Sequence, residues 1–155
     1  MVQAYAASVE VNPAGMTPVL GADQVWRGLV MKAENAVPFV PAMQSCVVVE
    51  RWSDGLLREV VNDGRRFREK ITFTPPVQVH FERQNSPEHA GWITNVISES
   101  KQGLFVTFTF AVRFPGVTPD SEEEKLVGES LKSRYRGAIE ATLAAVRRLV
   151  QEGKL

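Results

Sequence analysis

The sequence contains very few of the residues that build metal sites and disulfide bonds. Among its 155 residues there is one cysteine, Cys46, and there are two histidines, His80 and His89. A single cysteine cannot close an internal disulfide bond, and no spacing of these three residues resembles the ligand set of a zinc site. We therefore expect no bound metal and no cofactor.

The chain also lacks a surplus of charge of either sign, because 18 basic residues balance 18 acidic ones. Proteins that bind nucleic acid or an anionic membrane usually carry a basic patch, and this composition gives no sign of one. No apolar run approaches the ~20 residues of a membrane-spanning helix. Residues 1–5 lack the basic start and apolar core of a signal peptide. These absences predict a soluble, cytoplasmic protein with neither nucleic acid nor membrane as a partner.

Neither repeats nor low-complexity segments divide the chain, so we expect residues 1–155 to form a single domain, as a monomer or homodimer. Alternating apolar residues predict a strand over 5–11. Apolar residues three and four positions apart predict a helix over 22–33. Six further strands are expected over 43–52, 56–61, 65–74, 77–83, 91–98 and 104–114. The short turns between them favour antiparallel hairpins.

A long amphipathic helix is expected at the end of the chain, from about residue 120 to 152. Ser121 and Glu124 have the spacing of a capping box at its start. Its apolar stripe is bulky at both ends and small in the middle, and reads Val127, Leu131, Tyr135, Ala138, Thr142, Val146 and Leu149. The small residues indicate either a close approach of the helix to its neighbours or a cavity, and the sequence leaves both open.

Such a helix can bury its stripe only against the sheet that precedes it. The sequence therefore predicts an α+β helix-grip fold, with a curved antiparallel sheet wrapped around the long C-terminal helix. The order of elements resembles the START-like helix-grip (SRPBCC) superfamily. More specifically, the chain resembles the family named for the L protein of the acetylaranotin cluster (AtaL-like). The residues that carry this resemblance are segments 20–29, 39–41, 58–60, 69–71 and 104–110. The segment Gln24-Val-Trp-Arg-Gly-Leu29 is the most specific of these. The resemblance implies a cavity for a hydrophobic ligand and no particular reaction.

Glu69 is the most unusual candidate in the predicted cleft, because its neighbours at two-residue spacing are Phe67, Ile71 and Phe73. A carboxylate on an apolar face is costly unless it is paired or protonated. It is either held in an ion pair, with Arg58 or Arg113 for instance, or reached by water at the rim. Alternatively it is an acid, a base or a ligand anchor.

The other candidates are mostly apolar and are expected to line the same cleft. Ordinary core packing is the alternative explanation for Trp26, Phe108 and Phe110, and a core tyrosine bonded to a carbonyl is the alternative for Tyr135. The full set of expected ligand-binding residues is Trp26, Val30, Phe39, Glu69, Phe73, Trp92, Phe108, Phe110, Tyr135, Ala138 and Thr142.

The sequence thus predicts binding of a small hydrophobic molecule, aromatic or polyketide-like, between the sheet and the last helix. One alternative is a polyketide cyclase-like or dehydratase-like enzyme using Glu69 and Tyr135. Another is a protein-interaction module. No nucleophile elbow and no phosphate-binding loop is present, so no catalytic residue is assigned and the sequence does not decide whether the protein is an enzyme.

Overall fold

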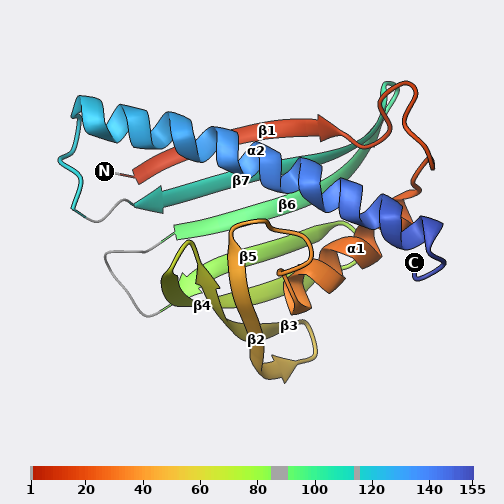
Figure 1. Cartoon of the computed structure of the whole chain (residues 1–155), viewed down its shortest axis with the longest axis horizontal. Coiled ribbons are helices and arrows are strands. Elements are labelled where there is room, and N and C mark those ends of the chain that lie inside the picture. Colours follow the sequence, from red (N-terminus) through yellow and green to blue (C-terminus); the bar gives the residue numbers. More distant parts are fainter. Residues whose placement is uncertain (1, 85–90, 114–115) are drawn as a thin grey trace.

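The computed structural model describes residues 2–84, 91–113 and 116–155 (Figure 1). In these residues two helices and one antiparallel sheet of seven strands are present. The elements in chain order are β1 (Val2–Glu10), α1 (Ala22–Glu34), β2 (Met43–Trp52), β3 (Gly55–Asn62), β4 (Arg65–Thr74), β5 (Gln78–Gln84), β6 (Gly91–Ser100), β7 (Gly103–Arg113) and α2 (Glu122–Gln151). The predicted fold class is confirmed, and the predicted bounds are close to the observed ones.

The strands lie in the order β1-β7-β6-β5-β4-β3-β2, so the first strand pairs with the last. Both helices lie on the same face of the sheet, and α2 crosses this face diagonally (Figure 1). Short turns connect β2 to β3, β3 to β4, β4 to β5 and β6 to β7, as the sequence predicts, and the β5–β6 connection lies outside the described residues. At the β3–β4 turn both Asp63 and Gly64 have positive φ, 52° and 74°, which suits a tight hairpin.

The main core lies between the sheet and the helices. On β7 every second residue is buried, from Leu104 through Phe108 to Val112, because successive side chains of a strand point to opposite faces. Ile139, Val146 and other residues of α2 are buried as well. No helix in the described residues is long and apolar enough to cross a membrane.

The start of α2 has the expected cap, with one difference. The Ser121 hydroxyl accepts a hydrogen bond from the Glu124 N–H at 3.1 Å. The Glu124 carboxylate, however, accepts from the N–H of Asp120 at 2.8 Å, one residue before the cap. Both bonds satisfy N–H groups that have no partner within the helix, and so they fix where α2 begins.

The two helices approach each other closely where Gly28 of α1 faces Val146 of α2. A Cβ atom added at Gly28 of α1 would lie 2.2 Å from Cγ2 of Val146. Thr142 is buried nearby, and its hydroxyl donates to the Ala138 carbonyl at 2.7 Å, so this polar atom is satisfied within the helix. The close packing of the two helices therefore depends on the missing side chain of Gly28 on α1.

Candidate functional site

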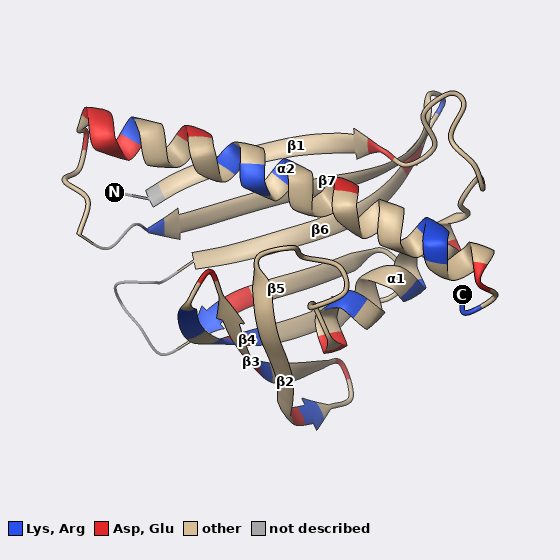
Figure 2. Cartoon of the chain, in the orientation of Figure 1, with Lys and Arg blue, Asp and Glu red and all other residues tan. Residues whose placement is uncertain are grey.

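The sheet is divided into an apolar part and a charged part. Strands β1, β6 and β7 carry charged residues only near their ends, whereas β3, β4 and β5 carry many (Figure 2). Helix α2 passes over the apolar strands, and α1 lies toward the charged side (Figures 1 and 2). The candidate site described below lies on the inner face of the sheet, where these two parts meet.

Three charged side chains form a row across this inner face. Arg58 on β3 is the register partner of Glu69 on β4, and Glu69 is the partner of Arg83 on β5. Directly paired residues of adjacent antiparallel strands point to the same face, so the three are immediate neighbours. Arg58 and Glu69 are almost completely buried, with exposed fractions of 3% and 4%.

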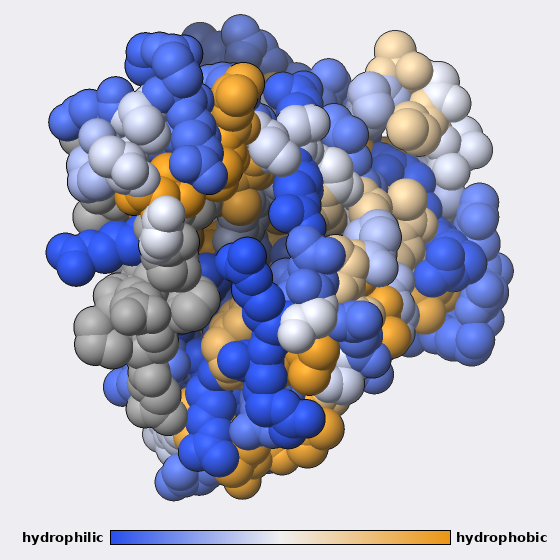
Figure 3. Space-filling view, turned by 60° about the vertical axis from the view of Figure 1, so that its left-hand side comes forward, coloured by the Kyte–Doolittle hydropathy of each residue, from blue (hydrophilic) through white to orange (hydrophobic). Residues whose placement is uncertain are grey.

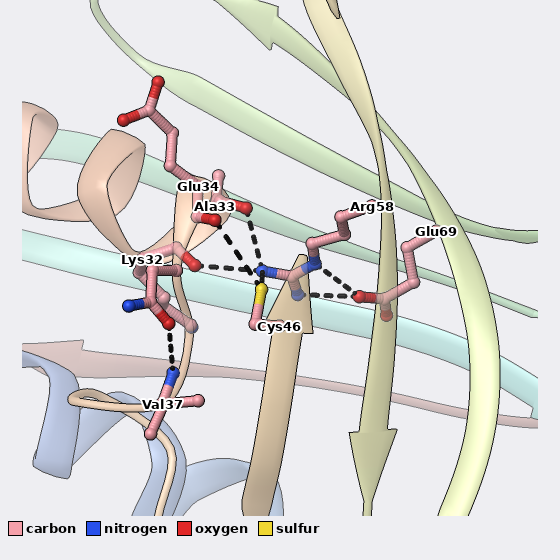
Figure 4. Close-up of polar contacts among 8 residues, drawn as sticks. Lys32, Ala33, Glu34, Val37, Cys46, Arg58 and Glu69 are labelled. Atoms are coloured by element: carbon pink, nitrogen blue, oxygen red, sulfur yellow. Dashed lines mark hydrogen bonds and ion pairs between the residues drawn. The ribbon is translucent and has the colours of Figure 1, made fainter. Parts of the chain in front are cut away.

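Arg58 and Glu69 form a buried ion pair (Figure 4). Arg58 Nε and Nη2 donate to the same oxygen, Glu69 Oε2, at 2.9 and 2.6 Å. Arg58 is one of the two arginines that the sequence suggested as a partner for Glu69. The ion pair removes the cost of a lone carboxylate on an apolar face.

The same arginine also closes the end of helix α1 (Figure 4). Arg58 Nη1 donates to the carbonyl oxygens of Lys32 and Ala33, both at 2.9 Å. The Glu34 carbonyl accepts from Cys46 Sγ at 3.6 Å, and the Met31 carbonyl accepts from a backbone N–H. The last four carbonyls of the helix therefore all have partners, and the positive charge of Arg58 lies at the negative end of the helix dipole.

Lys32 is the buried cation that the sequence reasoning missed. Its side chain is only 7% exposed, and Nζ lies 5.9 Å from the centre of the Phe81 ring, against which Arg58 also packs. Its ammonium group has no hydrogen bond or ion pair within the described part of the chain. The pKa of Lys32 is lowered from 10.5 to about 8, mainly by burial and also by the charge of Arg58, whereas the charge of Glu69 acts in the opposite direction.

Tyr135 of α2 lies over the apolar end of the site. Its ring stacks on Phe110, with the ring centres 4.5 Å apart. Burial raises the pKa of the Tyr135 hydroxyl, the charge of Arg83 and its hydrogen bond with Tyr135 lower it, and the charge of Glu69 raises it. Arg83 itself packs over the Phe67 ring at 4.8 Å, and its buried Nε has no acceptor among the described residues.

Asn95 is a second polar residue that the sequence reasoning missed. It is 1% exposed, and neither its Oδ1 nor its Nδ2 has a partner within the residues that the structure describes. Its register partners are Val79 on β5 and Phe108 on β7, both completely buried. The sequence contains a signal for this orientation, because Asn95 lies two residues from both Ile93 and Ile97 and therefore shares their face of the strand.

The structure places the other expected lining residues as follows. Trp26 packs edge-on against Phe73, with ring centres 6.2 Å apart. Buried residues are Phe39, Phe108, Phe110 and Thr142, and half-buried residues are Trp26, Val30, Phe73, Tyr135 and Ala138.

Trp92 does not join this group. It is 38% exposed, its register partner is the exposed Glu82, and its ring lies 6.0 Å from that of His80 on the outer face. Its neighbour on β6, Ile93, takes the inner face instead. Because successive side chains of a strand point to opposite faces, Trp92 lies on the outer face and does not line the cleft as expected.

A recess of about 440 Å³ lies elsewhere, beside the first turn of α1. It is lined by Ala22, Asp23, Pro76, Val77, Ile97, Glu99 and Leu104, and so includes none of the expected lining residues. Among the described residues no group of three histidine, cysteine, aspartate or glutamate side chains comes together to hold a metal ion.

A curved seven-stranded antiparallel sheet with a short first helix and a long last helix across its inner face defines the helix-grip fold. The chain belongs to the family of acetylaranotin biosynthesis cluster protein L (AtaL), whose model matches residues 5–153. No curated protein matches it.

Solved structures with the same fold include two aromatase/cyclases. One is the di-domain ARO/CYC StfQ from the steffimycin biosynthetic pathway, with a TM-score of 0.75, 13% identity and coverage of 97% of this chain. This chain spans only 52% of StfQ. The other is the Zhui aromatase/cyclase from Streptomyces sp. R1128, with a TM-score of 0.74, 13% identity and coverage of 97% of this chain and 96% of Zhui.

A third structure with this fold is Ara h 8.0201. It has a TM-score of 0.64, 16% identity and coverage of 94% of this chain and 98% of its own. At such low identities these similarities establish the fold alone.

Proposed function

We propose that the protein binds a small, mostly apolar molecule, aromatic or polycyclic, between α2 and the inner face of the sheet. The observation that carries this proposal is Asn95, whose two side-chain polar atoms are buried without a partner in the described chain. Buried polar groups in folded proteins are nearly always hydrogen-bonded, and an unpartnered one in an apolar surrounding costs free energy. A ligand with a polar group would supply the missing partner.

The apolar part of the proposed site is formed by aromatic residues from three elements. Phe108 and Phe110 of β7 lie next to Tyr5 of β1, with ring centres about 6 Å away, and Tyr135 stacks on Phe110 from above. Figure 3 shows hydrophobic atoms reaching the surface between hydrophilic ones on one side of the molecule, around a recessed area beside α2. Aromatic walls with a few polar groups are typical of sites for small apolar ligands.

The rival function is a cyclase-like or dehydratase-like enzyme, since StfQ and Zhui, which share the fold, are aromatase/cyclases. The charges of Arg83 and Glu69 both act on the pKa of Tyr135. Such convergence of titratable groups is a feature of active sites. Glu69, however, is bound by Arg58, which in turn closes helix α1. We favour binding over catalysis because this carboxylate has a structural task that accounts for its position.

The test is a fluorescence titration with the neutral dye N-phenyl-1-naphthylamine. We expect about one site per chain with a dissociation constant in the micromolar range, or ~8 kcal/mol. Ala138 and Ala144 offer a matched pair of variants, because both lie on α2 but the first is half-buried and the second is exposed. Ala138→Trp should fill the site and abolish binding, whereas Ala144→Trp should leave it intact.

Two outcomes count against the proposal. One is a folded wild-type protein that takes up no dye. The other is a folded Ala138→Trp variant that binds dye as the wild type does, which would place the dye elsewhere. Incubation with a poly-β-ketone substrate mimic, followed by mass spectrometry, addresses the enzyme reading, since turnover that is lost in Tyr135→Phe would favour catalysis.

A further inference from the structure

The inner face of the sheet carries more positive than negative charge. We call Lys32, Arg58, Glu69 and Arg83 the interior charged cluster. The row of Arg58, Glu69 and Arg83 follows from the strand register, and Lys32 reaches it from α1 over the Phe81 ring. Three cations thus face a single carboxylate, and within the described residues no other acidic side chain forms an ion pair with any of them.

The carboxylate of the interior charged cluster, Glu69, already has a partner. Glu69 accepts two hydrogen bonds from Arg58, which also donates to two carbonyls at the end of α1. Among the residues that the structure describes, the Lys32 ammonium, in a side chain that is 7% exposed, has no partner, and neither has the buried Nε of Arg83. Burying a cation without a counter-ion costs free energy.

A structural role does not explain a lysine at position 32. Val25, Leu29 and Ala33 occupy the same buried face of α1, and an apolar residue at position 32 would continue this face without a buried charge. The lowered pKa of Lys32, about 8, is a measure of the strain that burial and Arg58 impose on its charged form. A negative charge brought beside it would relieve that strain.

We propose that the ligand of this site carries an acidic group, a carboxylate or an acidic phenol, which forms an ion pair with Lys32 and is assisted by the Nε–H of Arg83. The inference rests on the proposed function and deepens it by naming the ligand class as an aromatic acid. The aromatic part would lie against Phe108, Phe110 and Tyr135, and the acidic part would face the interior charged cluster.

Two nearly isosteric probes test this assignment, namely 2-naphthoate and its neutral amide, 2-naphthamide. We expect the wild-type protein to bind the carboxylate about tenfold more tightly than the amide in calorimetric titrations at pH 7, since hydrogen bonds to charged groups are the stronger ones. Lys32→Met should remove this preference by weakening naphthoate alone. Lys101→Met, at an exposed turn, should preserve it.

The outcomes separate the two proposals. If N-phenyl-1-naphthylamine binds but naphthoate and naphthamide bind equally, or if the preference survives in Lys32→Met, the assignment of Lys32 is overturned and the proposed function stands. If neither the dye nor either naphthalene compound binds, the proposed function fails and this inference fails with it. Lys32→Gln, which keeps a polar side chain but no charge, repeats the test if Lys32→Met does not melt cooperatively.

Discussion

Arg58 and Glu69 are joined by two hydrogen bonds to one carboxylate oxygen, and the same guanidinium group holds the last turn of α1 through the carbonyls of Lys32 and Ala33. The ion pair therefore links β3 and β4 to the helix that covers them. It also fixes the positive charge of Arg58 near the ammonium group of Lys32, and this charge helps to lower the pKa of Lys32. One pair of residues thus connects the stability of the fold with the electrostatics of the proposed site.

Glu69→Gln should destabilise the protein by roughly 3–5 kcal/mol, because it leaves the Arg58 cation buried without its counter-ion. The free energy of unfolding is measured by denaturant titration. Glu59→Gln is the matched control, since Glu59 also pairs with arginines, at 2.7 and 3.3 Å, but with Arg66 and Arg68, whose side chains are 71% and 43% exposed. We expect it to cost under about 1 kcal/mol. A Glu69→Gln protein as stable as this control would contradict the structural role of the ion pair.

Lys32→Met should stabilise the ligand-free protein at pH 7. The folded state holds the pKa of Lys32 at about 8 instead of 10.5, and this difference corresponds to about 3 kcal/mol that the charged form costs on folding. Methionine fills a similar volume without the charge. Thermal melting of the wild type and the variant measures the effect, with Lys101→Met as the neutral comparison. A lower melting temperature for Lys32→Met would show that the ammonium group has a stabilising partner.

The advantage of Lys32→Met should shrink as the pH rises from about 8 to 10. In this window the unfolded chain keeps the Lys32 proton, whereas the folded protein has released it, so the stability of the wild type rises with pH. The charged groups that act on Lys32 are Arg58 and Glu69. They are the same in both proteins, so the difference between the two melting curves isolates Lys32. A difference that does not change with pH would refute the lowered pKa.

Gly28→Ala should cost about 1–3 kcal/mol, because the new methyl group would lie 2.2 Å from Val146 Cγ2 and would force α1 and α2 apart. Gly137→Ala is the contrasting variant, since nothing lies within 4 Å of a Cβ atom there. In the middle of an exposed helix surface it should stabilise by about 0.5–1 kcal/mol. Both are compared by denaturant titration, and equal effects of the two substitutions would show that the helices do not touch at Gly28.

Removal of the chain from Arg134 onward should abolish cooperative unfolding. The deletion takes away Ile139, Leu143 and Val146, which are at most 4% exposed and contribute roughly 1.5–3 kcal/mol each. It also uncovers Phe108 and Phe110. This loss rivals the ~5–15 kcal/mol stability of a whole domain. A truncated protein with a sharp melting transition would show that α2 is dispensable for the fold.

The sequence alone determined the elements and their order. Periodicity of two identified the strands, periodicity of three and four identified both helices, and short turns made the hairpins antiparallel. It also determined that Glu69 faces inward, because the neighbouring apolar residues share its side of the strand. These features depend on residues close together in the chain, and local patterns are sufficient to predict them.

Only the tertiary structure decided which partners the inward-facing residues meet. The sequence left Arg58 and Arg113 as candidates for Glu69, and the β3–β4 register selected Arg58. The sequence did not single out Lys32, and its lack of a counter-ion among the described residues depends on which strands α1 covers. Asn95 faces inward by alternation, yet its lack of a partner in the described part of the chain depends on the neighbouring strands β5 and β7. An alternating pattern fixes the face of a side chain, whereas contacts between distant segments depend on register and on how the helices cross the sheet.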